Sequence, residues 1–149
     1  MRFVALIAWF VTALWGLYML AVWLIENDAT GQGKSASRLP LPVILSHVTL
    51  AVTGLVVWVA YLLLDRQTLA WAALGILVVI ALLGLTMFAR WIPVYRMAGG
   101  GPAGAPDAGP QREMPAEGSF PVVVVFAHGT CAVSTVLLVL LTALGVGGS

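Results

Sequence analysis

The sequence predicts an all-α integral membrane protein: a four-transmembrane-helix bundle built from two parallel two-helix repeats. Hydrophobic residues make up 61% of the 149 residues and charged residues only 9%, whereas a soluble domain carries about 25% charged residues. Four apolar stretches are each close to the roughly 20 residues with which a helix crosses a bilayer. In addition, the second half of the chain repeats residues of the first half at matching positions.

The four predicted spans cover residues 3–25, 41–64, 69–92 and 120–144. The first span follows Arg2 and resembles a signal peptide, but its apolar core is too long and Glu26-Asn27-Asp28 is not a small-residue cleavage site. The loop at 65–68 is tight, so the second and third spans are expected to form an antiparallel hairpin. We therefore expect a single membrane domain over residues 1–149.

Glycine and proline dominate the third loop, which is expected to begin at Pro93. Residues 99–110 read Gly-Gly-Gly-Pro-Ala-Gly-Ala-Pro-Asp-Ala-Gly-Pro, a composition typical of flexible linkers. We therefore expect a flexible loop at about 97–118.

An internal repeat is the strongest sign of organisation. The residues Ala13, Leu14, Gly16, Leu17, Met19, Ala21 and Trp23 recur as Ala81, Leu82, Gly84, Leu85, Met87, Ala89 and Trp91. The pattern His47-x-Thr49-x-Ala51-Val52 recurs as His128-x-Thr130-x-Ala132-Val133. Such self-similarity indicates a tandem duplication of a two-helix unit, about 3–64 and about 69–144. Each unit contains an even number of spans, so the repeats should be parallel and related by an axis along the membrane normal.

The chain has two histidines, His47 and His128, at matching positions near the start of the second and fourth spans. These spans run in the same direction, and the histidines lie about 9 and 12 Å into them. An ionisable side chain within a span is costly and is a functional-site candidate. Because the repeat places the two imidazoles on opposite sides of the bundle axis, we expect them to be axial ligands of one b-type haem.

Several neighbouring residues fit this interpretation. Ala51, Gly54 and Ala132 are small residues expected on the histidine face of their helices, where they leave room for a macrocycle. Arg38 and Arg90 lie at span ends on the histidine side, and arginine binds carboxylates bidentately. We expect them to pair with the haem propionates, with Arg90 the preferred partner.

Other interpretations of these residues remain open. A histidine within a membrane can hold helices together by hydrogen bonding alone. Met19 and Met87 form a second symmetric pair, which could ligate iron or simply fill gaps in the core. Trp23, Trp91 and Tyr95 are interpreted as anchors at the membrane interface.

Composition excludes several other classes of site. The single cysteine, Cys131, excludes an internal disulfide, the attachment motif of a c-type haem and a cysteine-based zinc site. The net charge of +1 and the lack of a basic run give no sign of a nucleic-acid partner. No carboxylate lies within a predicted span, which disfavours a proton relay.

The arrangement of four spans, with a histidine near the start of the second and of the fourth, resembles one half of a haem A synthase bundle and other small bis-histidine b-type membrane cytochromes. In haem A synthases a span histidine typically has a glutamate three residues before it and an arginine after it. Here Ile44 and Val48 flank His47, and Val125 and Gly129 flank His128. The resemblance therefore implies haem-binding geometry at the two histidines and not hydroxylation of haem.

The expected function is that of a small b-type cytochrome, or a cytochrome-like subunit, that transfers electrons within a membrane redox complex. Its expected location is the plasma membrane, as a multi-pass protein, with other redox subunits or further copies of itself as partners. The alternative is a haem-free accessory subunit that acts as a scaffold. Orientation is open, because the distribution of positive charge puts the histidine side in the cytoplasm and the resemblance puts it outside.

Overall fold

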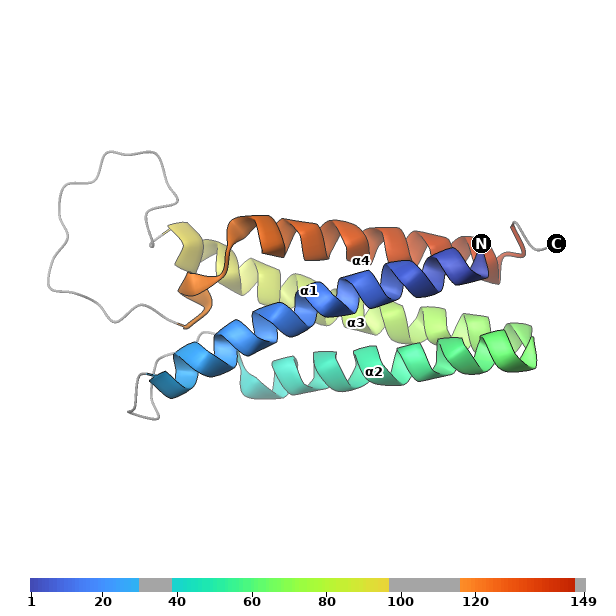
Figure 1. The fold of residues 1–149 in the computed structure, drawn as a ribbon, viewed down its shortest axis with the longest axis horizontal. Coiled ribbons are helices and arrows are strands. Elements are labelled where there is room, and N and C mark those ends of the chain that lie inside the picture. The colour runs from blue at the N-terminus through green and yellow to red at the C-terminus, as the bar shows by residue number, and fades with distance from the viewer. Residues whose placement is uncertain (30–38, 97–115, 147–149) are drawn as a thin grey trace, which may run out of the picture.

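The computed structural model describes residues 1–29, 39–96 and 116–146, which form four long helices and one short 3₁₀ helix (Figure 1). The long helices are α1 (Arg2–Ala29), α2 (Leu41–Leu64), α3 (Gln67–Tyr95) and α4 (Val122–Ala143), and the 3₁₀ helix is η2 (Ala116–Ser119). All four long helices are long and apolar enough to cross a membrane. The prediction of an all-α fold with four candidate spans is confirmed, and the fold is compatible with a multi-pass membrane protein.

The helices alternate in direction, so α2 and α4 run parallel to each other and both begin at the end of the bundle that carries η2 (Figure 1). We call this end the η2 end. The N-terminus, the end of α4 and the turn between α2 and α3 lie at the opposite end (Figure 1). Helix α2 packs most closely against α3, and α1 packs most closely against α4. Each close pair therefore joins one helix from each half of the chain.

The α2–α3 connection is as tight as its sequence suggests. Asp65 adopts a left-handed conformation (φ 49°) and donates its backbone N–H to the carbonyl of Tyr61, which ends α2. Its side chain accepts a hydrogen bond from Arg2 at 2.7 Å, so the start of α1 is tied to this turn. This geometry produces the expected antiparallel hairpin.

Helix α3 extends beyond its predicted end. The third loop was expected to begin at Pro93, but α3 continues through this proline to Tyr95. A proline removes one intrahelical hydrogen bond, and the last turn is held by Trp91 and Val94, which are only 4% and 1% exposed. Residues 97–115 of the predicted flexible loop lie outside the described residues, and its last residues belong to η2.

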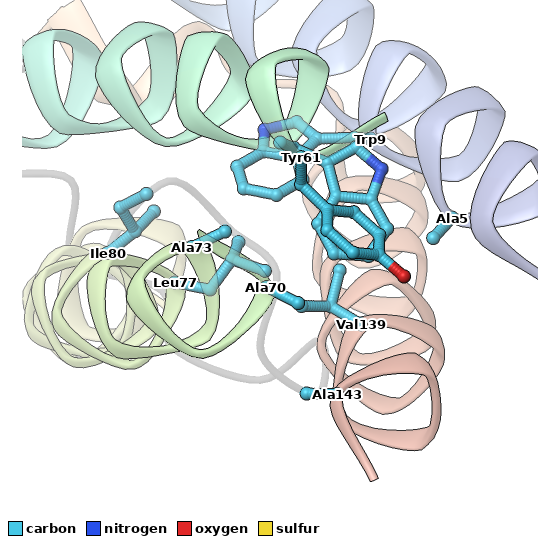
Figure 2. Close-up of a cluster of buried hydrophobic side chains, with 10 residues drawn as sticks. Ala5, Trp9, Tyr61, Ala70, Ala73, Leu77, Ile80, Val139 and Ala143 are labelled. Atoms are coloured by element: carbon cyan, nitrogen blue, oxygen red, sulfur yellow. The ribbon is translucent and has the colours of Figure 1, made fainter. Parts of the chain in front are cut away.

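Side chains from all four helices form an aromatic and aliphatic core (Figure 2). Trp58 is fully buried between Trp9 and Tyr61, with ring centroids 6.4 and 4.9 Å from theirs. Small residues line the same core, and Ala70 and Ala73 of α3 are fully buried. The small side chains let the helix backbones approach, and the large rings fill the remaining volume.

The pattern of buried positions repeats between the two halves of the chain. Pairs separated by 68 residues in α1 and α3, and by 81 residues in α2 and α4, are both buried: Ala5 and Ala73, Trp9 and Leu77, Trp23 and Trp91, Gly54 and Thr135, Trp58 and Val139, and Tyr61 and Thr142. These are the same offsets at which the sequence repeats. Equivalent helices therefore turn equivalent faces toward the bundle interior.

The tryptophans near the η2 end belong to the interior. Trp23 is 7% exposed and packs in a cluster with Ile44 and Met87, and Trp91 is 4% exposed. The prediction that these two tryptophans anchor the protein at the membrane interface is wrong, because their rings fill the end of the bundle. Tyr95 stacks on Trp91 with ring centroids 5.0 Å apart. The position of Met87 fits the gap-filling interpretation of that residue.

The outward faces of the long helices are apolar. Phe3 of α1, Leu63 of α2, Leu82 of α3 and Val123 of α4 are 65%, 80%, 60% and 74% exposed. A water-soluble monomer rarely exposes apolar patches that extend along whole helices. In contrast, a hydrocarbon environment requires such a surface.

The packing around Gly54 gives a direct test of the fold. A Cβ added there would lie 2.9 Å from Cζ2 of Trp9 and 3.0 Å from Cγ2 of Ile76. We expect Gly54→Ala to lower the free energy of unfolding in detergent by about 1–3 kcal/mol, the usual cost of overpacking a core.

The matched control is Gly75→Ala in α3, where a Cβ would meet nothing within 4 Å. This variant should be as stable as the wild type or slightly more stable, because alanine is the better helix former. Equal stability of the two variants would contradict the packing described for Trp9.

Candidate functional site

His47 of α2 and His128 of α4 meet inside the bundle. Their ring centroids are 6.4 Å apart and their planes are inclined by 55°. Both side chains are partly buried, and both come from the half of the bundle nearer the η2 end. The sequence expectation that the two histidines point toward each other from pseudo-symmetric helices agrees with this geometry.

Each histidine is hydrogen-bonded to the backbone of a neighbouring helix. Nδ1 of His47 lies 3.1 Å from the carbonyl oxygen of Ile80 in α3, and Nδ1 of His128 lies 3.0 Å from the carbonyl oxygen of Thr12 in α1. A carbonyl oxygen can only accept a hydrogen bond, so Nδ1–H is the donor in both cases. The neutral ring then carries its lone pair on Nε2. Neither Nε2 has a hydrogen-bond partner among the residues that the structure describes.

A glycine lies beside each of these hydrogen bonds. A Cβ added at Gly84 would lie 3.3 Å from Cε1 of His47, and a Cβ added at Gly16 would lie 3.0 Å from Cε1 of His128. We call the Ile80 carbonyl and Gly84 the α3 contact, and the Thr12 carbonyl and Gly16 the α1 contact. In each contact the glycine follows the carbonyl residue by four positions, about one helical turn, so both lie on one face of the helix.

The two contacts are related by the internal repeat. Ile80 and Gly84 stand 68 residues after Thr12 and Gly16, respectively. His47 belongs to the first half of the chain and binds the second half, and His128 does the reverse. Neither half alone therefore contains both a histidine and the backbone that orients it.

The separation of the rings fits a single metal ion between them. A metal–imidazole bond of about 2.0 Å, added to the roughly 1.1 Å from ring centre to nitrogen, gives a centroid separation of roughly 6.2 Å for two ligands on opposite sides of one ion. The observed separation is 6.4 Å. Metal-bound histidines almost always donate the other ring N–H to a carboxylate, a carbonyl or water, and both rings do so here. The arrangement thus suits haem iron with two histidine ligands.

A metal ion without a macrocycle has fewer suitable ligands. Within the described ranges, no group of three or more histidine, cysteine, aspartate or glutamate residues is placed to hold one. Two imidazoles complete the coordination of an iron that already has four porphyrin nitrogens. They do not complete a tetrahedral zinc site.

The three small residues predicted to line the cofactor differ from one another in their surroundings. Ala51 and Ala132 are partly buried, each one helical turn after its histidine. Gly54 is buried against the Trp9 indole and Ile76, which occupy the space in front of its Cα. Its lack of a side chain is therefore explained by helix packing.

The two predicted propionate partners are at the η2 end or outside the described residues. Arg90 lies near the end of α3 with an exposed side chain. Arg38 lies outside the described residues. Their pairing with a cofactor stays a prediction.

The surroundings of two glycines of the site, and of a carboxylate in η2, could not be assigned from the sequence. Gly16 and Gly84 are part of the repeat, but the sequence does not say which side chain faces them. Glu117 of η2 is fully buried where η2 packs against α1 and α3. No pattern in the sequence marks this carboxylate as interior.

Next to the α1 contact lies a pair of threonine hydroxyls, which has no equivalent at the α3 contact. The hydroxyl oxygens of Thr12 and Thr135 are 3.1 Å apart, and Thr135 is 1% exposed. The equivalent positions in the other half of the bundle are Ile80 and Gly54, which have no hydroxyl groups. The two histidines therefore have backbone partners that are equivalent in the repeat, Ile80 and Thr12, but different surroundings.

Comparison with protein-family models, with curated proteins and with solved structures finds no match to this chain. The resemblance to haem A synthase therefore remains an expectation from topology and histidine placement.

The hydroxyl pair between α1 and α4 is open to measurement by a double-mutant cycle. We expect Thr12→Val and Thr135→Val to be coupled by about 0.6 kcal/mol in the free energy of unfolding, the mean found for hydrogen bonds between membrane helices. The hydroxyls of Thr12 and Thr135 each also lie 2.8 Å from a carbonyl of their own helix, that of Ala8 or Cys131, so only one of the two donates across the helices at a time. As a control, Thr53 is exposed and its hydroxyl donates to the Thr49 carbonyl of its own helix. Thr53→Val should not couple to Thr12→Val, and full additivity of the first pair would contradict the contact.

Proposed function

We propose that this protein is a small b-type cytochrome that holds one haem b between α2 and α4 through His47 and His128. The observation that supports this most strongly is the geometry of the two imidazoles, 6.4 Å apart between centroids and each engaged through Nδ1–H by a backbone carbonyl. Both rings are then in the tautomer that binds a metal through Nε2. Histidine is a common axial ligand of haem iron.

The residues around the site have separable roles in this proposal. Nε2 of His47 and Nε2 of His128 would hold the iron. The carbonyls of Ile80 and Thr12 hold the rings in place and make them stronger donors, because a hydrogen bond from Nδ1–H increases the electron density on the imidazole. Arg90 and Arg38 are the candidate partners for the propionates, since guanidinium groups bind carboxylates in a fixed geometry.

When bound, haem supplies one-electron redox chemistry, and the protein determines its position and potential. The apolar bundle around the histidines excludes water and lowers the local dielectric constant, which is one of the ways a protein adjusts the potential of a haem. No catalytic residue is assigned to this chain. Electron transfer within a larger membrane assembly is the proposed role.

The apolar outer surface supports a location within a membrane. We infer that the four helices span the plasma membrane, with lipid against their outward faces and other redox subunits or further copies of the chain as partners. The repeated positions of the core, of the histidines and of their backbone contacts support an origin by duplication of a two-helix unit.

A haem-free scaffold is the second candidate, and one observation favours it. Both histidines already hydrogen-bond across helices, which is how histidine holds membrane helices together without a cofactor. Rings 6.4 Å apart can also contact each other directly, without a metal ion. The cytochrome is preferred because it accounts both for this spacing and for the donation of Nδ1–H by each ring, which leaves Nε2 as the ligand atom.

A reduced-minus-oxidised visible spectrum of protein purified from haem-replete cells tests the proposal. We expect sharp b-type bands in the wild type and loss of these bands in both His47→Ala and His128→Ala. Met19→Leu and Met87→Leu are the controls. They should keep the wild-type bands, because these methionines are not ligands in the proposed site.

Chemical rescue distinguishes the loss of an iron ligand from a failure of the histidine variant to fold. Adding imidazole to His47→Gly or His128→Gly should restore the bands, because free imidazole can occupy the vacated ligand position. A colourless wild type would reject the cytochrome and favour the scaffold. Loss of the bands in a methionine variant would reject bis-histidine ligation.

A further inference from the structure

We propose that Gly16 and Gly84 are positioning residues, which fix the ring planes and the separation of the two imidazoles because they have no Cβ. The inference rests on the proposed function where it concerns haem, but its geometric part concerns the histidines alone. It adds two residues to the site that bind nothing themselves and act through His128 and His47.

Backbone conformation does not require glycine at either position. Both residues lie inside regular helices, and neither has a positive φ. In such positions glycine is less favourable than alanine by about 1 kcal/mol. Gly75, also in α3, has nothing within 4 Å of an added Cβ, so a glycine in these helices need not contact a neighbour.

A methyl group added at either glycine would press against an imidazole ring. At Gly16 it would lie 3.0 Å from Cε1 and 3.5 Å from Nδ1 of His128, and at Gly84 it would lie 3.3 Å from Cε1 and 3.8 Å from Nδ1 of His47. Both distances to Cε1 are shorter than ordinary carbon–carbon contacts of about 3.5–4.0 Å. The methyl group would press on the same edge of the ring that donates to the backbone carbonyl.

Displacement of either ring by the methyl group would change its hydrogen bond and the geometry of the histidine pair. A ring that gives way to the methyl group by moving a few tenths of an ångström off the helix that carries the carbonyl lengthens the hydrogen bonds of 3.1 and 3.0 Å. Each ring faces the other histidine at 6.4 Å, so the movement changes the spacing or inclination of the pair. The absence of a Cβ at the two glycines thus leaves room for the observed ring positions, with planes inclined by 55°.

The same combination occurs twice, at equivalent positions in the two halves of the chain. In both cases a carbonyl and a glycine one turn later contact Nδ1 and Cε1 of a histidine from the other half. Close helix packing alone would explain small residues in these positions. It would not explain why both glycines face the imidazole of a histidine.

The geometric part is tested without a cofactor by nitrogen NMR of the protein labelled with ¹⁵N-histidine. The chain has only two histidines, so two ring systems are expected, both protonated at Nδ1. Gly84→Ala should shift the His47 ring and leave His128 largely unchanged, Gly16→Ala should do the reverse, and Gly75→Ala should shift neither. A pattern in which Gly16→Ala and Gly84→Ala behave like Gly75→Ala would overturn the inference.

The part that concerns haem is tested by the midpoint potential and the ferric electron paramagnetic resonance spectrum of the loaded protein. A weakened hydrogen bond from Nδ1–H makes imidazole a poorer donor. We therefore expect a higher potential and an altered low-spin signal in Gly16→Ala and Gly84→Ala, with Gly75→Ala unchanged. If the wild type binds haem and the three glycine variants have the same potential and spectrum as the wild type, the positioning role is overturned and the cytochrome proposal stands. Selective NMR shifts in a protein that never binds haem would uphold the positioning role and reject the cytochrome.

Discussion

The structure depends on a reciprocal contact: each histidine donates Nδ1–H to a backbone carbonyl in a helix from the other half of the chain. His47 binds α3 and His128 binds α1, so the pairs α2–α3 and α1–α4 are each joined where the two rings face one another. Backbone carbonyls within a helix are rigidly held, so these acceptors fix the ring positions more firmly than side chains would. The contact also determines which ring nitrogen has the lone pair, and this links the packing of the bundle to its proposed chemistry.

Among the described residues, the other polar contacts between helices include the Thr12–Thr135 hydroxyl pair beside His128 and two contacts at the end of the bundle opposite η2. The Arg2–Asp65 ion pair ties α1 to the α2–α3 turn, and the amide of Gln67 donates to the last carbonyls of α4. Between these contacts and the histidines lies the core around Trp58. Helices surrounded by lipid gain little from the hydrophobic effect between them, so close packing and hydrogen bonds must hold them together. Packed side chains near both ends of the bundle, together with these hydrogen bonds, hold the helices together.

The sequence predicted the parts of the fold that follow from hydrophobic length and from the repeat. The bounds of α2, the parallel α2 and α4, and two histidines at equivalent positions follow from apolar runs and spacing. The face that a helix turns toward the interior depends on its rotation about its own axis. A helix that is apolar on all sides has no polar face in its sequence from which this rotation can be predicted. For this reason Trp23 and Trp91 were expected at the interface, the packing of Gly54 against Trp9 was missed, and no partner was assigned to Gly16 or Gly84. Packing of the whole bundle end similarly determined the extension of α3 beyond Pro93 and the burial of Glu117.

In the proposed site, both ligands of one iron come from a single chain. The molar ratio of haem b to polypeptide in the purified protein, determined together with the spin state of the iron, tests this arrangement. We expect a ratio close to one, with the iron six-coordinate and low-spin. A ratio near one half would mean that two copies share a haem, and a ratio near zero would mean that the histidines hold helices and not iron. Either result would reject a haem held by both histidines of one chain.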